Sequence, residues 1–109
     1  MGFVKVADVS ELPVGAMKKV VVGERTILLA NVEGTYYALP NKCPHMGGSL
    51  ADGQLEGAFV TCPRHGARYD VRSGQVVGDA HILFIKTKPQ NALTYPVRME
   101  GTSILVELP

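Results

Sequence analysis

Two short clusters of cysteine and histidine constrain this chain more than any other feature. Cys43 and His45 flank a proline, and Cys62 and His65 lie close together further along. They are the only two cysteines and two of the three histidines. Each pair offers one thiolate and one imidazole. The pairs therefore suit a two-metal site in which one metal takes both sulfurs and the other takes both imidazoles.

Length and charge narrow the classes of protein that need to be considered. The 109 residues suit one domain, and we expect residues 1–109 to form it. The net charge of +1 and the lack of a long Lys/Arg cluster argue against a nucleic-acid partner. The longest apolar runs, such as residues 26–32, are too short to span a bilayer, so no membrane association is expected.

A disulfide between Cys43 and Cys62 is the simplest alternative to metal binding. Residues 1–6 contain no basic region followed by an apolar stretch, so no secretory signal is recognised. We therefore expect a reducing, cytoplasmic location, which favours metal binding over a structural disulfide.

Most segments are short and rich in Val, Ile, Leu, Thr and Tyr, with turn residues between them, which predicts an all-β antiparallel sandwich or barrel. One helical turn is expected at residues 8–12, where Asp8 or Ser10 would cap it and Pro13 would end it. Both Cys/His pairs fall in connections between strands, in neighbouring loops at about residues 41–50 and 60–70. The predicted strands are 3–7, 16–22, 25–32, 35–40, 59–62, 67–70, 93–99 and 103–107.

The residues around both pairs resemble a known pair of motifs. Residues 43–53 (CPHMGGSLADG) are similar to the first Rieske box and residues 60–70 (VTCPRHGARYD) to the second. The chain resembles a small Rieske-type ferredoxin, such as the carriers of bacterial aromatic-ring dioxygenases. This resemblance implies a Rieske-type antiparallel fold with a small cluster-binding subdomain of two loops. It also implies one [2Fe–2S] cluster per chain, with four ligands: Cys43, His45, Cys62 and His65.

Neighbouring residues are expected to tune the cluster. Loop glycines permit positive φ angles and let backbone N–H groups approach the bridging sulfides. Pro44 and Pro63 fix the bend after each ligand cysteine without offering an N–H. The expected neighbours of the cluster are Gly47, Gly48, Leu50, Arg64, Gly66, Ala67 and Tyr69.

Four of these neighbours indicate which branch of the family the chain resembles, because the branches differ at the matching positions. Gly48 and Arg64 stand where the respiratory branch has two further cysteines, so no disulfide can join the loops. Ala67 replaces a serine that donates a hydrogen bond to a sulfide. Tyr69 matches a tyrosine that donates to a ligand cysteine, although an ordinary half-buried aromatic is an equal alternative. One lost donor predicts a potential in the lower part of the Rieske range of about −150 to +300 mV.

The segment 78–91 is longer than in most ferredoxins of this type. It could form a docking surface, or a peripheral strand or hairpin that completes the core. Its His81 is not expected to bind the cluster, because both imidazole positions are already filled.

The resemblance implies a soluble, monomeric electron carrier rather than an enzyme. A flavin-dependent reductase would donate one electron, and a terminal oxygenase would accept it. His45 and His65 would lie at the exposed tip, because the electron resides on the iron that they bind. The surrounding contact patch is expected to consist of Met46, Leu50, Pro63 and Arg64.

Two alternatives remain open. The small subunits of assimilatory nitrite reductases resemble this fold and size, so the chain could be a stable subunit rather than a carrier. Two cysteines and two histidines can also bind a structural zinc ion.

Overall fold

The computed structural model describes residues 2–42, 49–63, 66–78, 80–82, 85–87 and 92–109. All strand pairs among these residues are antiparallel, which confirms the predicted all-β antiparallel fold. No helix in this described part has the length and apolarity needed to cross a membrane. In chain order the elements are β1 (Gly2–Asp8), η1 (Val9–Glu11), β2 (Met17–Val22), β3 (Arg25–Val32), β4 (Thr35–Pro40), η2 (Leu50–Asp52), β5 (Gln54–Glu56), β6 (Phe59–Thr61), β7 (Arg68–Asp70), β8 (Val76–Gly78), β9 (Ala80–Ile82), β10 (Ile85–Thr87), β11 (Val97–Glu100) and β12 (Ser103–Leu108).

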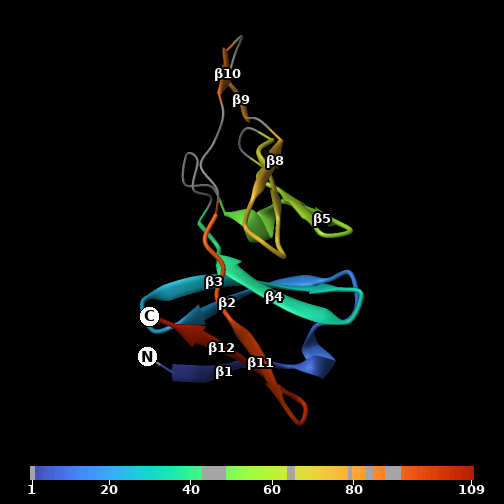
Figure 1. Ribbon diagram of the computed structural model, residues 1–109, viewed down its shortest axis with the longest axis vertical. Coiled ribbons are helices and arrows are strands. Elements are labelled where there is room, and N and C mark those ends of the chain that lie inside the picture. The colour runs from blue at the N-terminus through green and yellow to red at the C-terminus, as the bar shows by residue number, and fades with distance from the viewer. Residues whose placement is uncertain (1, 43–48, 64–65, 79, 83–84, 88–91) are drawn as a thin grey trace.

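The sheet of β2, β3 and β4 forms the middle layer of the molecule (Figure 1). Successive side chains of a strand point to opposite faces of its sheet. Leu28 and Ala30 of β3 accordingly pack into one core, and Ile27 and Leu29 pack into the other. Both faces are covered, so β3 is buried as a continuous apolar run rather than as an alternating pattern.

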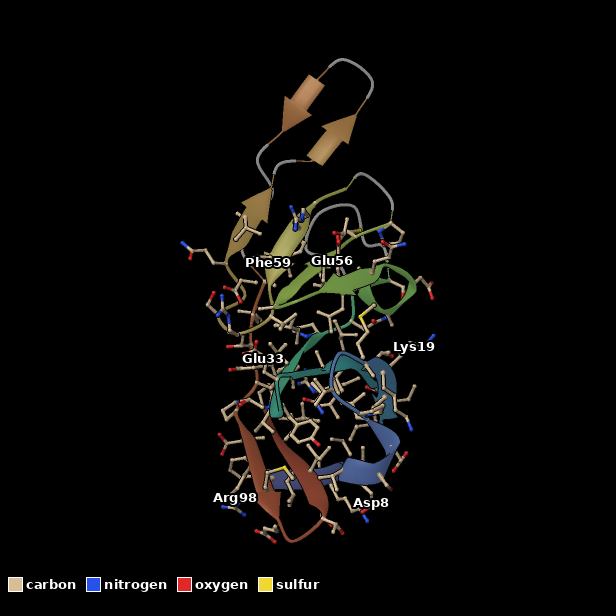
Figure 2. The ribbon with its side chains drawn as sticks, turned by 90° about the vertical axis from the view of Figure 1, so that its right-hand side faces the viewer. Asp8, Lys19, Glu33, Glu56, Phe59 and Arg98 are labelled. Atoms are coloured by element: carbon tan, nitrogen blue, oxygen red, sulfur yellow. The ribbon has the colours of Figure 1, made fainter. Side chains whose placement is uncertain are left out.

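The sheet β1–β12–β11 covers one face of the middle sheet (Figure 1). Alternate residues of β12, namely Ile104, Val106 and Leu108, are buried against the middle layer. The adjoining 3₁₀ helix η1 confirms the predicted helical turn, and the Asp8 N–H donates to Oε2 of Glu11 at 2.9 Å. Figure 2 labels Asp8 at this end of the molecule. We call these two three-stranded sheets, with η1, the base.

The sheet β5–β6–β7–β8 lies over the other face of the middle sheet. Leu55, Val60 and Tyr69 stand opposite one another on neighbouring strands and face inward. Glu56 and Phe59 pair on the opposite side of the sheet, and Figure 2 labels both. We call this sheet, η2 and the two connections that hold the Cys/His pairs the loop-bearing part.

Residues 92–96 form a strap between the loop-bearing part and the base. The Ala92 N–H donates to the Gly74 carbonyl at 2.6 Å, and the Tyr95 N–H donates to the Ala38 carbonyl at 2.9 Å. The predicted strand at 93–99 is therefore wrong in its first half, because β11 begins only at Val97. Pro96 offers no N–H to a strand ladder, and only Tyr95 makes an isolated bridge.

Within the segment 78–91, the described strands β9 and β10 pair with each other, and neither contributes a residue to the two buried cores of the described chain. Ile85 pairs with Ile82, and Thr87 pairs with Ala80. Among the described residues, β9 and β10 hydrogen-bond only to each other. Figure 1 shows this hairpin beyond β8, at the end of the molecule opposite to β1.

Candidate metal centre

Cys62 lies at the base of a tightly closed loop between β6 and β7. Its N–H donates to the Ala67 carbonyl at 2.7 Å, and its own carbonyl accepts a hydrogen bond from the Gly66 N–H at 3.1 Å. These bonds fix the chain on both sides of the turn, so the direction of the Cα–Cβ bond is set by the backbone. The thiol is free, and the residue is only 2% exposed. A free, buried thiol whose backbone is held by two hydrogen bonds fits a metal ligand.

The same loop adjoins a cavity. Gly66 has a φ of +76°, as predicted for a glycine that permits a left-handed backbone, and a side chain there would meet no atom of the described residues within 4 Å. A cavity of about 400 Å³ is lined by Cys62 and Gly66, together with Asp52 and Glu56. A cysteine that lines a cavity fits an iron–sulfur group bound at this loop.

Three predicted neighbours of the cluster have side chains that are inaccessible to solvent. Ala67 and Tyr69 are 0% exposed and belong to the same core as Cys62. Tyr69 is thus fully buried, rather than half-buried as the alternative of an ordinary strand aromatic assumed. Leu50 is also 0% exposed, so its predicted place in an exposed contact patch is wrong. Because η2 turns Leu50 toward β3 and β6, this side chain contributes to the core instead.

The first loop is closed at its base. Lys42 pairs with Ser49 in an isolated antiparallel bridge, and the Leu50 N–H donates to the Asn41 carbonyl at 2.8 Å. Ser49 leads into η2, which turns the chain toward β5. The described residues on either side of the first Cys/His pair are therefore held next to each other.

A close backbone contact connects the two loops. A Cβ atom on Gly53 would lie 1.8 Å from the Thr61 carbonyl oxygen, so only glycine fits there. Gln54 pairs with Thr61, the residue that precedes Cys62. The exit of the first loop is thus fixed against the strand that carries the second.

An ion pair organises the turn after β7. Oδ1 of Asp70 accepts hydrogen bonds from the N–H and Nε of Arg72, both at 2.9 Å, and Oδ2 accepts one from Nη2 at 2.8 Å. The side-chain hydrogen bond from Arg72 holds the pKa of the Asp70 carboxyl below its ordinary value, against the opposing effect of burial. The turn presents Gly74 to Ala92 of the strap, where a Cβ atom on Gly74 would lie 2.2 Å from the Ala92 oxygen.

The structure places five of the predicted site residues together: Leu50, Cys62, Gly66, Ala67 and Tyr69. The other predicted site residues lie outside the described residues: Cys43, His45, Gly47, Gly48, Arg64 and His65. Met46, predicted for the contact patch, also lies outside them. Sequence reasoning missed the roles of Asn41, Gly53 and Gly74. Gly53 ends the first motif, but the sequence around it does not reveal that its backbone contacts Thr61 in the folded chain.

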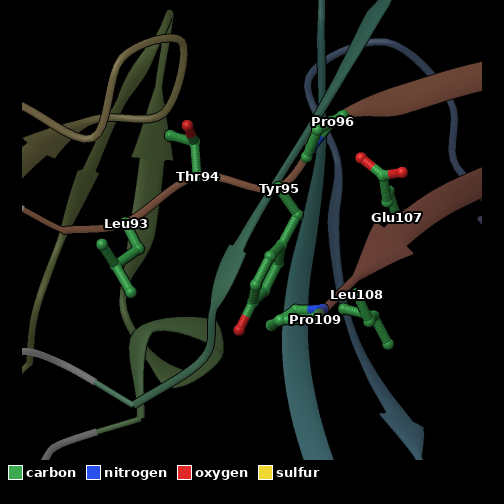
Figure 3. Close-up of a pocket in the computed structure, with 7 residues that line it drawn as sticks. All are labelled: Leu93, Thr94, Tyr95, Pro96, Glu107, Leu108 and Pro109. Carbon is green, nitrogen blue, oxygen red and sulfur yellow. The ribbon is translucent and has the colours of Figure 1, made fainter. Parts of the chain in front are cut away.

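A second cavity of about 370 Å³ lies beside the strap, away from the two loops. Figure 3 shows the ring of Tyr95 extending from the strap toward the end of β12. Among the described lining residues, Glu107 has the only carboxylate side chain, and none is a predicted ligand. This cavity therefore lies apart from the candidate metal centre.

Comparison with known proteins agrees with the site. The family model described as the Rieske [2Fe–2S] domain matches residues 2–87. The ferredoxin component of a naphthalene 1,2-dioxygenase system from Pseudomonas aeruginosa is 36% identical, over 90% of this chain and 88% of that protein. The biphenyl dioxygenase ferredoxin subunit of Pseudomonas sp. strain KKS102 is 32% identical, over 98% and 93%.

A solved structure extends this agreement to the fold. The ferredoxin of carbazole 1,9a-dioxygenase from Nocardioides aromaticivorans IC177 superposes with a TM-score of 0.82 at 28% identity, and the match covers 97% of each chain. The chain belongs to the Rieske [2Fe–2S] domain family, and its cofactor is a [2Fe–2S] cluster.

Proposed function

We propose that this protein is a one-electron carrier whose [2Fe–2S] cluster is held by Cys43, His45, Cys62 and His65. The observation that carries the proposal is the free, buried thiol of Cys62 at the base of a closed loop. The relatives named above support it, because their names describe ferredoxin components of dioxygenase systems rather than catalytic subunits. The alternation of β3 between two cores supports a single domain over residues 1–109.

The [2Fe–2S] cluster supplies a one-electron redox centre when it is bound. The thiolates of Cys43 and Cys62 would stabilise the ferric state of one iron, and the neutral imidazoles of His45 and His65 would make the other iron easier to reduce. The outer nitrogens of His45 and His65 can hold protons whose acidity depends on the oxidation state. Reduction is therefore expected to take up protons at alkaline pH.

Ala67 and Tyr69, the buried residues that follow the second loop, support a reduction potential in the lower part of the Rieske range of about −150 to +300 mV. Ala67 is fully buried behind the second loop and has no hydroxyl to donate. Tyr69 is the neighbouring buried residue that has one. We propose that Tyr69 donates to a ligand sulfur and that the missing donor at Ala67 lowers the potential.

We propose a terminal oxygenase as the electron acceptor and a flavin-dependent reductase as the donor. The naphthalene and biphenyl relatives are named as components of dioxygenase systems, which supports an oxygenase acceptor. We further propose that the carrier is a cytoplasmic monomer. Pro63 is exposed beside Cys62 and remains in the proposed contact patch with Met46 and Arg64, whereas Leu50 does not.

The test is an EPR spectrum of the dithionite-reduced protein, with His65→Cys and His81→Cys as matched variants. We expect the wild type to give a mean g value below that of an all-cysteine cluster. His65→Cys should lower the midpoint potential and weaken its pH dependence, because an imidazole is lost. His81→Cys should change neither. A colourless protein that contains zinc would contradict the proposal, as would an unchanged potential in His65→Cys.

A further inference from the structure

Asn41 is one of the few buried polar residues of the described chain, at 6% exposed. All four of its hydrogen-bonding groups have partners. Its N–H donates to the Thr26 carbonyl at 3.0 Å, and its carbonyl accepts from the Leu50 N–H at 2.8 Å. Nδ2 donates to Oγ of Ser49 at 2.8 Å, and Oδ1 accepts from the Ala51 N–H at 2.9 Å. The residue is thus held from every side.

These partners belong to three parts of the fold. Thr26 lies in β3 of the base, Ser49 ends the first loop, and Ala51 lies in η2. The side-chain amide of Asn41 therefore ties the start of the first loop to its end and to the element that follows. Removing it would leave the Ala51 N–H without its present partner, and a partly buried N–H without a partner is costly.

The contacts of Asn41 reach the second loop through η2. Ala51 is followed closely by Gly53, whose backbone packs against the Thr61 carbonyl. Thr61 directly precedes Cys62. The side chain of Asn41 therefore lies at one end of a short chain of fixed backbone contacts that joins the loop of Cys43 and His45 to that of Cys62.

Asn31 offers the same chemistry at a site remote from both loops. It is 3% exposed, its Nδ2 donates to the Leu12 carbonyl, and its Oδ1 accepts from the Gly34 N–H, both at 2.8 Å. Its partners lie in the connections of the base. The two asparagines are therefore comparable in burial and bonding but differ in what they hold.

We propose that Asn41 is a positioning residue for the iron–sulfur cluster: it fixes the spacing between the two loops, and through them the geometry of the ligands. The proposal rests on the ligand set proposed above. Loss of a hydrogen bond made directly to a ligand typically weakens metal binding about 10–100-fold. Asn41 bonds instead to Thr26, Ser49, Leu50 and Ala51, so it would act on the ligands through the backbone of the first loop.

The experiment compares Asn41→Ala with Asn31→Ala in the cluster-loaded protein. Both variants should lower the melting temperature, since each loses buried hydrogen bonds. Only Asn41→Ala should change the EPR g values, shift the midpoint potential and accelerate cluster loss in a chelator by about tenfold or more. Ser49→Ala should produce smaller changes in the same direction, and Ser49→Thr should restore the wild-type values.

Two results would overturn the proposal. One is an Asn41→Ala protein with wild-type g values, potential and rate of cluster loss. The other is an Asn31→Ala protein that changes these properties as much as Asn41→Ala does. If Asn41→Ala does not fold, wild-type values in Ser49→Ala would refute the proposal in its place. A wild-type protein without the mixed-ligand signal would instead refute the proposed ligand set.

Discussion

The base and the loop-bearing part are stabilised in different ways. The base consists of strands that are mostly six to eight residues long, and its core is aliphatic, with Leu12, Ile27 and Ile104 fully or almost fully buried. Every strand of the β5–β8 sheet has three residues, and the neighbouring core includes Cys62 and Tyr69. Such short strands add few ladder hydrogen bonds. The loop-bearing part therefore depends more on turn bonds, close backbone contacts and its metal centre.

The middle sheet belongs to the base, but it also contacts the loop-bearing part. Neighbouring residues of β3 face different cores, so one strand supports both the base and the wall behind Cys62. Substitutions at adjacent residues of β3 should therefore perturb cluster retention and the stability of the base to different extents.

The largest effect is expected for Cys62→Ser, which exchanges the thiol for a hydroxyl with little change in volume. We expect loss of the cluster, measured as iron content and visible absorbance. Because metal binding contributes to folding, amides of β5–β8 should lose hydrogen-exchange protection while those of β2–β4 retain it. Full iron content and a wild-type spectrum would show that Cys62 is not a ligand.

Leu28→Ala and Leu29→Ala test the two faces of β3. The residues are 1% and 0% exposed, so each change should cost about 2–5 kcal/mol in the free energy of unfolding, measured with urea. Only Leu28→Ala opens the core that contains Cys62, and it should accelerate cluster loss more than Leu29→Ala. Equal rates of loss in the two variants would remove the distinction between the cores.

Gly53→Ala tests the backbone contact between the loops. The added Cβ would overlap the Thr61 oxygen, so we expect a cost of about 3 kcal/mol, the upper part of the overpacking range, together with faster cluster loss. Gly57→Ala is the control, since its Cβ meets open space and only its φ of +61° is unfavourable, at about 1–2 kcal/mol. A smaller loss of stability for Gly53→Ala than for Gly57→Ala would count against the contact.

The smallest effect is expected for the Asp70–Arg72 pair, because the Arg72 side chain is 51% exposed and solvent screens the interaction. The pKa of Asp70 is lowered in the folded protein. The pair therefore stabilises above the ordinary carboxyl value of 3.8, and this contribution is lost as the pH falls through the lowered pKa. Asp70→Asn should show a shallower loss of melting temperature in acid. An unchanged dependence of the melting temperature on pH in acid would mean that the Asp70–Arg72 pair does not contribute to stability.

The base could be predicted well from the sequence. Residues 25–32 and 35–40 were predicted as strands, and β3 and β4 have those bounds. Their apolar runs are long and end at turn residues. The strands β5 and β8, with three residues each, were not predicted, because such short segments show no periodicity and form only when neighbouring strands pair with them.

The candidate site was predicted in part. Spacing identified Cys62 as a ligand candidate, and the structure places Cys62 beside Gly66, Ala67 and Tyr69. Its role as a ligand stays a prediction. The exposure of Leu50 was predicted wrongly, since its direction is set by η2 rather than by the motif. Asn41 was missed as a supporting residue because its partners, from Thr26 to Ala51, meet only in the folded chain.

The ligand set is tested most directly by the nitrogen couplings of the reduced cluster. Electron–nuclear double resonance on protein with ¹⁵N-labelled histidine, compared with His45→Cys and His65→Cys, measures how many imidazoles bind iron. We expect two strongly coupled histidine nitrogens in the wild type and one in each variant whose cluster survives. A wild-type spectrum without histidine couplings, or with couplings unchanged in either variant, would contradict it.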